Sequence, residues 1–276
     1  MAKLMYQAYW QLTERPFENS LDLRFYYPSQ CHQAALLKLR YALETQAEAA
    51  LLAAGPGMGK TLLVGMLGHL LGERFGPWIQ LGFPQMRLQE VLEYVADELE
   101  GEKTERASAS IAWSIRRIER LLDKLAGQGR HPILVVEDAH LITEAEHWEE
   151  LRLLMNFRAG QRVGWTLLLV AQPPLLPLLE RMPAWEDRLA IKCLLRPFEP
   201  MDTAAYVAHR LKVAGASRDL FEPDALAALH QLSHGVPRRI NRLADLALLL
   251  GYAESQEIIL AEHVQAVAEE MFTFSS

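Results

Sequence analysis

The sequence predicts an α/β protein whose parallel sheet is followed by a small all-helical domain. Short apolar runs typical of buried strands alternate with helical segments up to about residue 195, a glycine-rich turn joins the first run to a helix, and only helical patterns follow. We therefore expect a sheet domain over residues 1–195, which includes an N-terminal arm, and a helical lid over residues 196–276.

In the first domain, each strand is predicted from an uninterrupted apolar run and each helix from apolar residues at helical spacing. An aromatic arm over 6–27 comes first, and the stretch 100–110 is charged and turn-like. The expected strands are 49–53, 78–81, 133–136, 165–171 and 188–195. The expected helices are 32–45, 60–71, 88–99, 111–126 and 146–157. Strands that alternate with helices in this way predict parallel βαβ units.

After the Arg196-Pro197-Phe198 boundary, the pattern predicts the helices 202–214, 223–234, 237–253 and 261–271. The whole chain has 276 residues, a formal charge of −7 and 50% hydrophobic residues, which excludes a disordered polar chain and a disulfide-stapled miniprotein. Its two cysteines, Cys31 and Cys193, match no zinc or redox spacing. Without a signal peptide or an apolar run of about 20 residues, we expect a cytoplasmic protein with no transmembrane segment.

A phosphate-binding loop of the Walker A type lies between the first strand and the helix at 60–71. Its residues are Ala54, Gly55, Pro56, Gly57, Met58, Gly59, Lys60 and Thr61, with Leu62 next in the helix. Glycines let backbone N–H groups approach phosphate oxygens, and the helix N-terminus adds favourable partial charge. Lys60 is predicted to reach the β- and γ-phosphates of ATP, and the Thr61 hydroxyl to bind Mg²⁺. Ala54 stands where the motif has glycine.

Two adjacent carboxylates, Glu137 and Asp138, end the strand at 133–136, beside the expected phosphate loop. We expect Glu137 to hold Mg²⁺ and Asp138 to orient or deprotonate the attacking water. The usual order is Asp then Glu, so the base here is shorter by one methylene, about 1 Å, which favours slow hydrolysis. His140 and His147 follow without a third metal ligand in a recognised pattern, so we expect solvated or core-edge histidines.

Two further polar residues are placed to sense the nucleotide. Gln172 ends the strand at 165–171, where a γ-phosphate contact and a simple strand-ending turn are equally expected. Arg238 lies in the first turn of the helix at 237–253, where a cation opposes the helix dipole and a bound phosphate would offset that cost.

These motifs, in this order, resemble the general secretion pathway protein A group of P-loop AAA+ ATPases over nearly the whole chain. The matching residues are Tyr9, Pro16-Phe17 and Phe25-Tyr26 of the arm, Gly57 to Thr61, Glu137 to His140, Gln172-Pro173, Tyr206 with His209 to Leu211, and Gly235 to Asn241. The resemblance implies a sensor-2 role for Arg238, adenine contacts from Pro16 and Phe17, and ATP-driven assembly of a homo-oligomeric ring or filament. Transposon target-selection ATPases are also similar.

The resemblance leaves the partner open. Secretion members of the group continue past the lid into a membrane span and a peptidoglycan-binding domain, so we carry over only the motor core. It also implies an arginine finger that reaches a neighbouring subunit's nucleotide; Arg188 fits first and Arg181 second, and a surface ion pair is equally expected for each.

Three functions remain in view. The first is an Mg-dependent ATPase that acts on a partner, as a secretion or pilus accessory would. The second is a nucleotide switch with little hydrolysis. The third is an ATP-gated, DNA-associated regulator, for which Arg116, Arg117 and Arg120 would supply a basic helical patch.

Overall fold

The computed structural model describes residues 5–101 and 110–273, which form two compact units. Unit 2 comprises residues 32–56 and 64–195, and it contains the sheet. Unit 1 comprises residues 1–31, 57–63 and 196–276, and it contains the C-terminal helices. Most of the charged stretch 100–110 expected as a turn lies outside the described residues.

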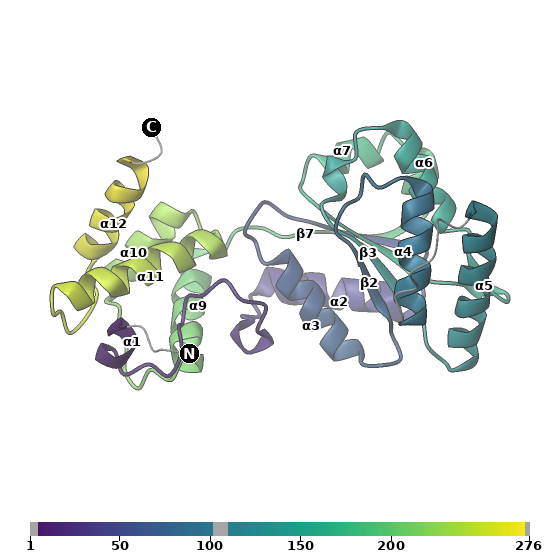
Figure 1. The fold of residues 1–276 in the computed structure, drawn as a ribbon. Helices are drawn as coiled ribbons and strands as arrows, with labels where there is room; N and C mark the ends of the chain where they lie inside the picture. Colours follow the sequence, from purple (N-terminus) through teal and green to yellow (C-terminus); the bar gives the residue numbers. More distant parts are fainter. Residues whose placement is uncertain (1–4, 102–109, 274–276) are drawn as a thin grey trace. The chain divides into compact units, whose positions relative to one another are not determined.

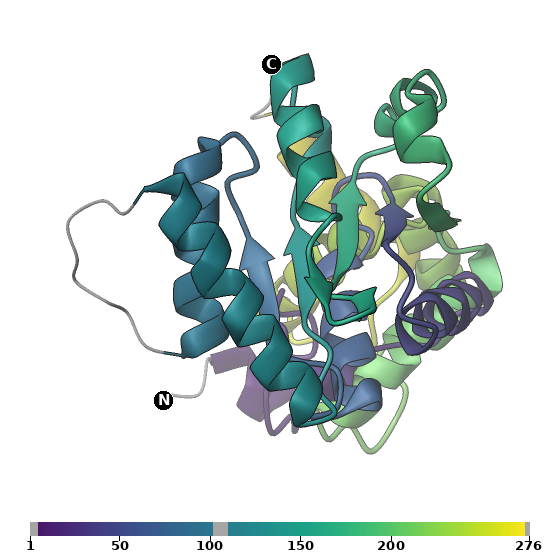
Figure 2. The same cartoon turned by 90° about the vertical axis from the view of Figure 1, so that its right-hand side faces the viewer.

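The sheet of unit 2 has five parallel strands in the order β2-β3-β6-β1-β7. Figure 2 shows them from left to right in this order, with all arrows pointing the same way. Their bounds are β1 Ala49–Ala53, β2 Trp78–Leu81, β3 Ile133–Val136, β6 Thr166–Ala171 and β7 Leu189–Leu194. The expected parallel α/β architecture is therefore confirmed.

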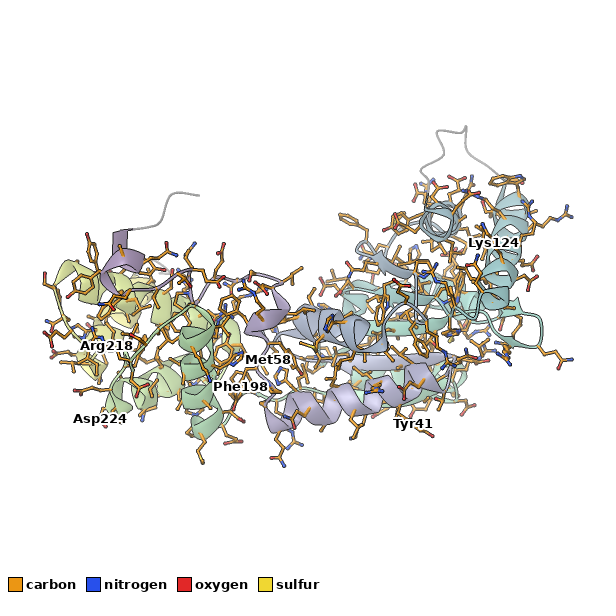
Figure 3. All side chains as sticks on the ribbon, turned by 90° about the horizontal axis from the view of Figure 1, so that it is seen from below. Tyr41, Met58, Lys124, Phe198, Arg218 and Asp224 are labelled. Atoms are coloured by element: carbon orange, nitrogen blue, oxygen red, sulfur yellow. The ribbon has the colours of Figure 1, made fainter. Side chains whose placement is uncertain are left out.

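Every residue of the three central strands β1, β3 and β6 is buried, because helices cover both faces of a sheet made of parallel strands. The helices that lie wholly or mostly in unit 2 are α2 Gln30–Glu44, α3 Lys60–Leu71, α4 Leu88–Glu100, α5 Ile111–Gly127, η2 Ala139–Leu141, α6 Ala145–Leu154, α7 Leu175–Leu179 and α8 Pro183–Glu186, and Figure 1 labels α2 to α7. The amphipathic α2 leaves Tyr41 exposed (Figure 3), while Leu39 on the same helix is fully buried.

Helices α4 and α5 are joined by Arg117, which the sequence placed in an exposed basic patch. Its side chain is only 9% exposed and forms ion pairs with Asp97 and Glu100 of α4. Arg116 and Arg120 do lie on the surface. The three-arginine patch is thus wrong, because the carboxylates that bind Arg117 lie on the neighbouring helix.

Several short elements of unit 2 were not predicted, among them η2. Residues 158–163 form a small hairpin, β4 Arg158–Ala159 and β5 Arg162–Val163, which turns at Gly160 with a φ of +60°. The apolar run after residue 167 ends its strand at Ala171 and continues as the short helices α7 and α8, because its prolines interrupt the strand pattern.

The helical part of unit 1 consists of α9 Pro200–Val213, α10 Pro223–Ser233, α11 Pro237–Ala253 and α12 Ala261–Thr273. The N-terminal arm, with α1 Met5–Tyr9 and η1 Leu23–Phe25, packs into the same core. Trp10 is 2% exposed, and its indole donates to the Leu248 carbonyl of α11. The arm therefore packs with the C-terminal helices, whereas the sequence grouped it with residues 1–195.

Arg210 of α9 anchors the arm by several contacts. Its guanidinium donates to the carbonyls of Pro16 and Glu18 and lies 4.6 Å from the centre of the Phe25 ring. It also donates to the hydroxyl of Tyr206. Burial raises the pKa of Tyr206, so this hydroxyl stays protonated at neutral pH.

None of the helices in the described ranges, 5–101 and 110–273, has the length and hydropathy needed to cross a lipid bilayer.

Candidate functional site

The glycine-rich loop leaves the carboxyl end of β1 and opens α3. Gly57 and Gly59 have φ angles of +76° and +84°, the left-handed region that glycine adopts without steric cost. The Leu63 N–H donates to the Gly59 carbonyl at 2.9 Å and closes the first helical turn. Thr61 is exposed, Lys60 is half-buried and Met58 is buried. The loop is thus a glycine-rich turn at a helix N-terminus, a place where backbone N–H groups can meet an anion.

Ala54 fits the position where the motif has glycine. It is fully buried, and its N–H donates to the Ala171 carbonyl at the end of β6. Ala54 is not among the described residues with a positive φ, so its β-carbon costs no backbone strain. The departure from the motif is therefore structurally neutral.

Arg238 lies against this loop, within the same unit. Its backbone N–H, in the first turn of α11, donates to the Gly57 carbonyl at 3.1 Å. A β-carbon added to Gly57 would lie 2.7 Å from the Arg238 β-carbon, closer than any real contact allows. Gly57 is therefore required both by its φ angle and by the approach of α11, and the Arg238 side chain is exposed beside the loop.

The two acids differ in their surroundings. The Glu137 N–H donates to the Leu81 carbonyl, which continues the β2–β3 ladder, and its side chain is half-buried. Asp138 adopts a left-handed backbone with φ 47° and begins η2, and its side chain is 56% exposed. Aspartate tolerates this conformation better than most residues. The longer carboxylate is therefore the more enclosed, and the shorter one projects towards solvent.

Gln172 follows β6 at the same edge of the sheet, because β6 lies between β3 and β1 and all three run parallel. Its backbone N–H donates to Nδ1 of His140 at 3.4 Å, and that nitrogen lies 3.9 Å from an oxygen of Asp138. His140, expected as a solvated or core-edge residue, thus links the ends of β3 and β6. The only sequence signal for this contact was its place directly after the acid pair.

Arg188 lies at the opposite end of the strands from Glu137 and Gln172. It precedes Leu189, which pairs with Ala49 at the start of β1, so it sits where the strands begin. Its guanidinium donates to the Asn156 side chain at 2.9 Å and lies 3.6 Å from a Glu48 oxygen. Within its own chain, Arg188 is therefore remote from the edge that carries Glu137 and Gln172.

Arg181, the second choice for a finger, lies between α7 and α8 and is exposed.

Pro16 and Phe17 are buried in the core of unit 1. The Phe17 ring is 2% exposed and packs edge-on against Phe221 at 6.1 Å. Contact of this pair with adenine stays a prediction.

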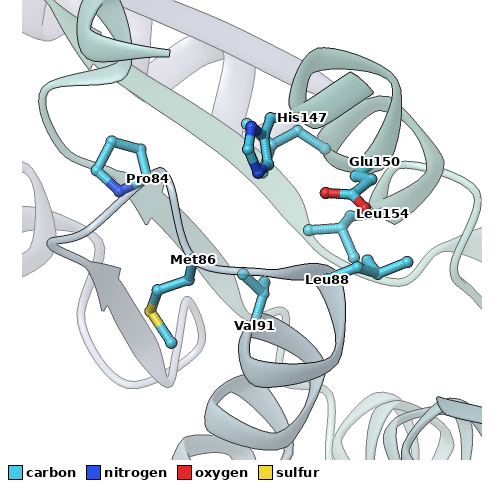
Figure 4. A pocket seen from close by; sticks show the side chains of 8 residues that line it. Pro84, Met86, Leu88, Val91, His147, Glu150 and Leu154 are labelled. Carbon is cyan, nitrogen blue, oxygen red and sulfur yellow. The ribbon is translucent and has the colours of Figure 1, made fainter. Parts of the chain in front are cut away.

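His147 faces a small apolar recess between the start of α4 and α6 (Figure 4). The recess has a volume of about 10 Å³, room for about one water molecule. In the described parts of the chain, no group of three or more His, Cys, Asp and Glu side chains is arranged to hold a metal ion. His147 is thus a core-edge residue.

Comparison with known proteins agrees with this geometry. A family model described as an AAA domain matches residues 43–179. General secretion pathway protein A of Aeromonas hydrophila is 30% identical over 272 residues, which is 97% of this chain and 48% of that protein. The chain thus spans about half the length of this curated relative.

Two solved structures share the fold. The ORC2 protein of Aeropyrum pernix, solved in ADPNP–ADP complexes, superposes with a TM-score of 0.70 and 16% identity over 93% of this chain and 71% of that one. Drosophila ORC bound to DNA gives a TM-score of 0.71 and 15% identity over 98% of this chain and 67% of that one. At these identities, the likeness establishes the fold.

Proposed function

Because this chain is an AAA+ protein, with an AAA domain over residues 43–179 in a P-loop AAA+ fold, we propose that it is an Mg-dependent ATPase that drives oligomer assembly or the remodelling of a partner. One observation carries the proposal: the loop after β1 has two left-handed glycines at a helix N-terminus, and Arg238 of α11 lies directly against it. A cation beside a turn that presents N–H groups suits a triphosphate.

In this proposal, residues Ala54 to Leu62 cradle the phosphates, with Lys60 on the β- and γ-phosphates. Asp138 orients the attacking water, Gln172 and Arg238 sense the γ-phosphate, and Pro16-Phe17 border the adenine. The exposure of Asp138 and Arg238 supports these roles, because both side chains are free to meet a ligand.

The Thr61 hydroxyl and the Glu137 carboxylate would hold Mg²⁺. Both are hard oxygen donors, the type that Mg²⁺ prefers, and Thr61 is exposed in the first turn of α3. When bound, the ion would neutralise charge on the phosphates. The part played by the chain itself is to orient water through Asp138 and to fix the phosphates through the loop.

Calorimetric titration of the Lys60→Ala chain with Mg-ATP tests the site. We expect binding to fall below detection, because the loop loses its cation. Lys124→Ala is the matched control, since this exposed lysine lies on α5 (Figure 3) and should leave the affinity unchanged. Unchanged affinity in Lys60→Ala would refute the site.

A nucleotide switch with little hydrolysis is the second candidate. It is favoured by the short Asp138, whose carboxylate points towards solvent while the longer Glu137 is more enclosed. Single-turnover kinetics separate the two functions. Turnover at the solution background supports the switch, and turnover well above it that is lost in Asp138→Asn supports the ATPase.

A finger role for Arg188 is proposed only between subunits, since in its own chain it lies at the other edge of the sheet. Arg188→Ala and Lys60→Ala should each be inactive, and an equimolar mixture should regain turnover, because each variant supplies the residue that the other lacks. A mixture with no regained turnover would exclude the finger role. Mass measurement with and without ATP would test for a ring or filament.

The pathway is proposed from likeness to general secretion pathway protein A, which makes a secretion or pilus complex the first partner to test. We place the ATPase in the cytoplasm, a compartment that suits the thiols of Cys31 and Cys193, which form no disulfide in the part of the chain that the structure describes. DNA association is the alternative, since one similar structure is of a protein bound to DNA. DNA binding that is ATP-dependent and falls steeply with salt would favour it.

A further inference from the structure

A cavity of about 290 Å³ lies at the edge of the sheet where the strands begin, opposite the edge that carries Glu137 and Gln172. It is open to solvent on one side and is lined by the segments that enter β1, β2, β3 and β6, by the end of α5 and by the hairpin β4–β5. Its polar side chains are Arg74, Arg130, His131, Arg162 and Gln46, and the other lining residues are small or apolar. The cavity is thus distinct from the proposed ATP site.

Three arginines from three separate segments give this cavity its charge. Arg74 lies 5.4 Å from the Phe75 ring, and a guanidinium nitrogen of Arg130 lies 3.6 Å from where a β-carbon on Gly76 would be, so both side chains border one loop. Arg162 comes from the hairpin β4–β5.

No carboxylate lines the cavity, and in the described residues none of these three arginines forms an ion pair within 4 Å. Arg158 and Arg188, which lie where the same strands begin, share an ion pair with the single carboxylate of Glu48. In a chain of net charge −7, the arginines of the cavity are therefore an uncompensated local excess of positive charge.

His131 adds no charge to the cavity, and its pKa responds to the charge of Arg74. The Thr166 hydroxyl donates to the Ala47 carbonyl, so it accepts the N–H of His131 Nε2 at 2.9 Å. Burial, with a smaller contribution from the charge of Arg74, lowers the pKa of His131 to about 4. The ring is therefore neutral at physiological pH, and the positive charge of the cavity belongs to the arginines alone.

We propose that this cavity binds a compact phosphorylated small molecule, whose phosphoryl group is held by Arg74, Arg130 and Arg162. Guanidinium forks match phosphate oxygens in pairs, which an isolated ammonium does not. The volume is close to the lower limit of small-molecule pockets, about 300 Å³, and suits a ligand no larger than a mononucleotide. The three arginines are exposed at its rim, and a hollow of this size favours a compact ligand over an extended nucleic-acid strand.

Inorganic pyrophosphate is the probe, titrated calorimetrically into the full chain carrying Lys60→Ala, which weakens binding at the phosphate loop. Adding Arg130→Gln or Arg162→Gln should weaken pyrophosphate binding at least tenfold. Adding Arg116→Gln, which changes an exposed arginine of α5, should leave it unchanged. In the otherwise native chain, Arg130→Gln and Arg162→Gln should retain Mg-ATP affinity, so this inference and the proposed function can fail separately.

Thermal melting of each variant checks folding, and Arg162→Gln on the surface hairpin serves if Arg130→Gln does not fold. No pyrophosphate binding at millimolar concentration, or binding insensitive to both substitutions, would overturn the proposal. A 20-nucleotide single strand that binds through these arginines more tightly than pyrophosphate would also overturn it, because the ligand would then be nucleic acid.

Discussion

Gly57→Ala tests the contact between the phosphate loop and α11. The φ of +76° at Gly57 costs an alanine about 1–2 kcal/mol. The new β-carbon would lie 2.7 Å from the Arg238 β-carbon, and overpacking of this kind costs about 1–3 kcal/mol more. We expect the variant to lose about 2–5 kcal/mol in unfolding free energy. Because the loop or α11 must shift, Mg-ATP affinity should fall by about 10- to 100-fold.

The assay combines denaturant unfolding with calorimetric titration of Mg-ATP. Gly72→Ala is the matched control, since Gly72 has φ +63° and no atom lies within 4 Å of where its β-carbon would be. It should lose only the backbone term and keep its ATP affinity. In Gly57→Ala/Arg238→Gly, the opposing β-carbon is gone, so the two substitutions should couple favourably by about 1 kcal/mol or more in unfolding free energy. Native ATP affinity in Gly57→Ala would refute the reasoning.

Three further predictions concern stability and turnover. The pKa of His131 is 6.5 in the unfolded chain and about 4 in the folded one. As the pH falls from 6.5 to 4, the unfolded chain therefore binds a proton that the folded chain does not, and the free energy of unfolding falls by about 3 kcal/mol. His131→Gln should remove that part of the slope in urea unfolding, and a wild-type slope in the variant would count against it. Arg117→Met should remove the cation that pairs with Asp97 and Glu100 and lower the free energy of unfolding by about 1–3 kcal/mol in the same assay. This range is below the value for a fully buried pair because both carboxylates are partly exposed. An unchanged urea midpoint would show that the two ion pairs contribute nothing. Asp138→Asn should stay within about 0.5 kcal/mol of wild type, because asparagine also tolerates φ 47°, while ATP turnover falls at least tenfold; retained turnover would exclude Asp138 as the base.

The strands could be predicted from sequence almost to the residue. The run 133–136 is uninterrupted and apolar, and the structure has the strand at Ile133–Val136. A strand that is buried on both faces must be apolar throughout, so a short apolar run in the sequence is enough to predict it. The glycine-rich turn between β1 and α3 could also be predicted, because its glycines lie at fixed spacing along a continuous segment, while its binding of phosphate stays a prediction.

The contacts between distant segments could not be predicted in this way. Arg117 looked like a surface cation because the carboxylates that bind it belong to another helix. The approach of Arg238 to Gly57 joins residues 181 positions apart. The sequence predicted a phosphate beside Arg238, from its place in the first turn of a helix and from the family resemblance, but not this contact with Gly57. His140 was judged by metal-ligand spacing, and its contact with the Gln172 N–H depends on which strands are neighbours in the sheet.

The outermost strand β7 has a consequence for how copies of this chain can associate. Its backbone pairs with β1 on one side, with a register shift beside Ala49, and Lys192 stands in its middle with its ammonium bound to Glu186. Another strand docking there would have to strip water from this ion pair and follow an irregular rim. Self-association by extension of the sheet beyond β7 is thereby discouraged, so copies that meet at this side of the molecule would do so through side-chain surfaces and not through a shared β-ladder.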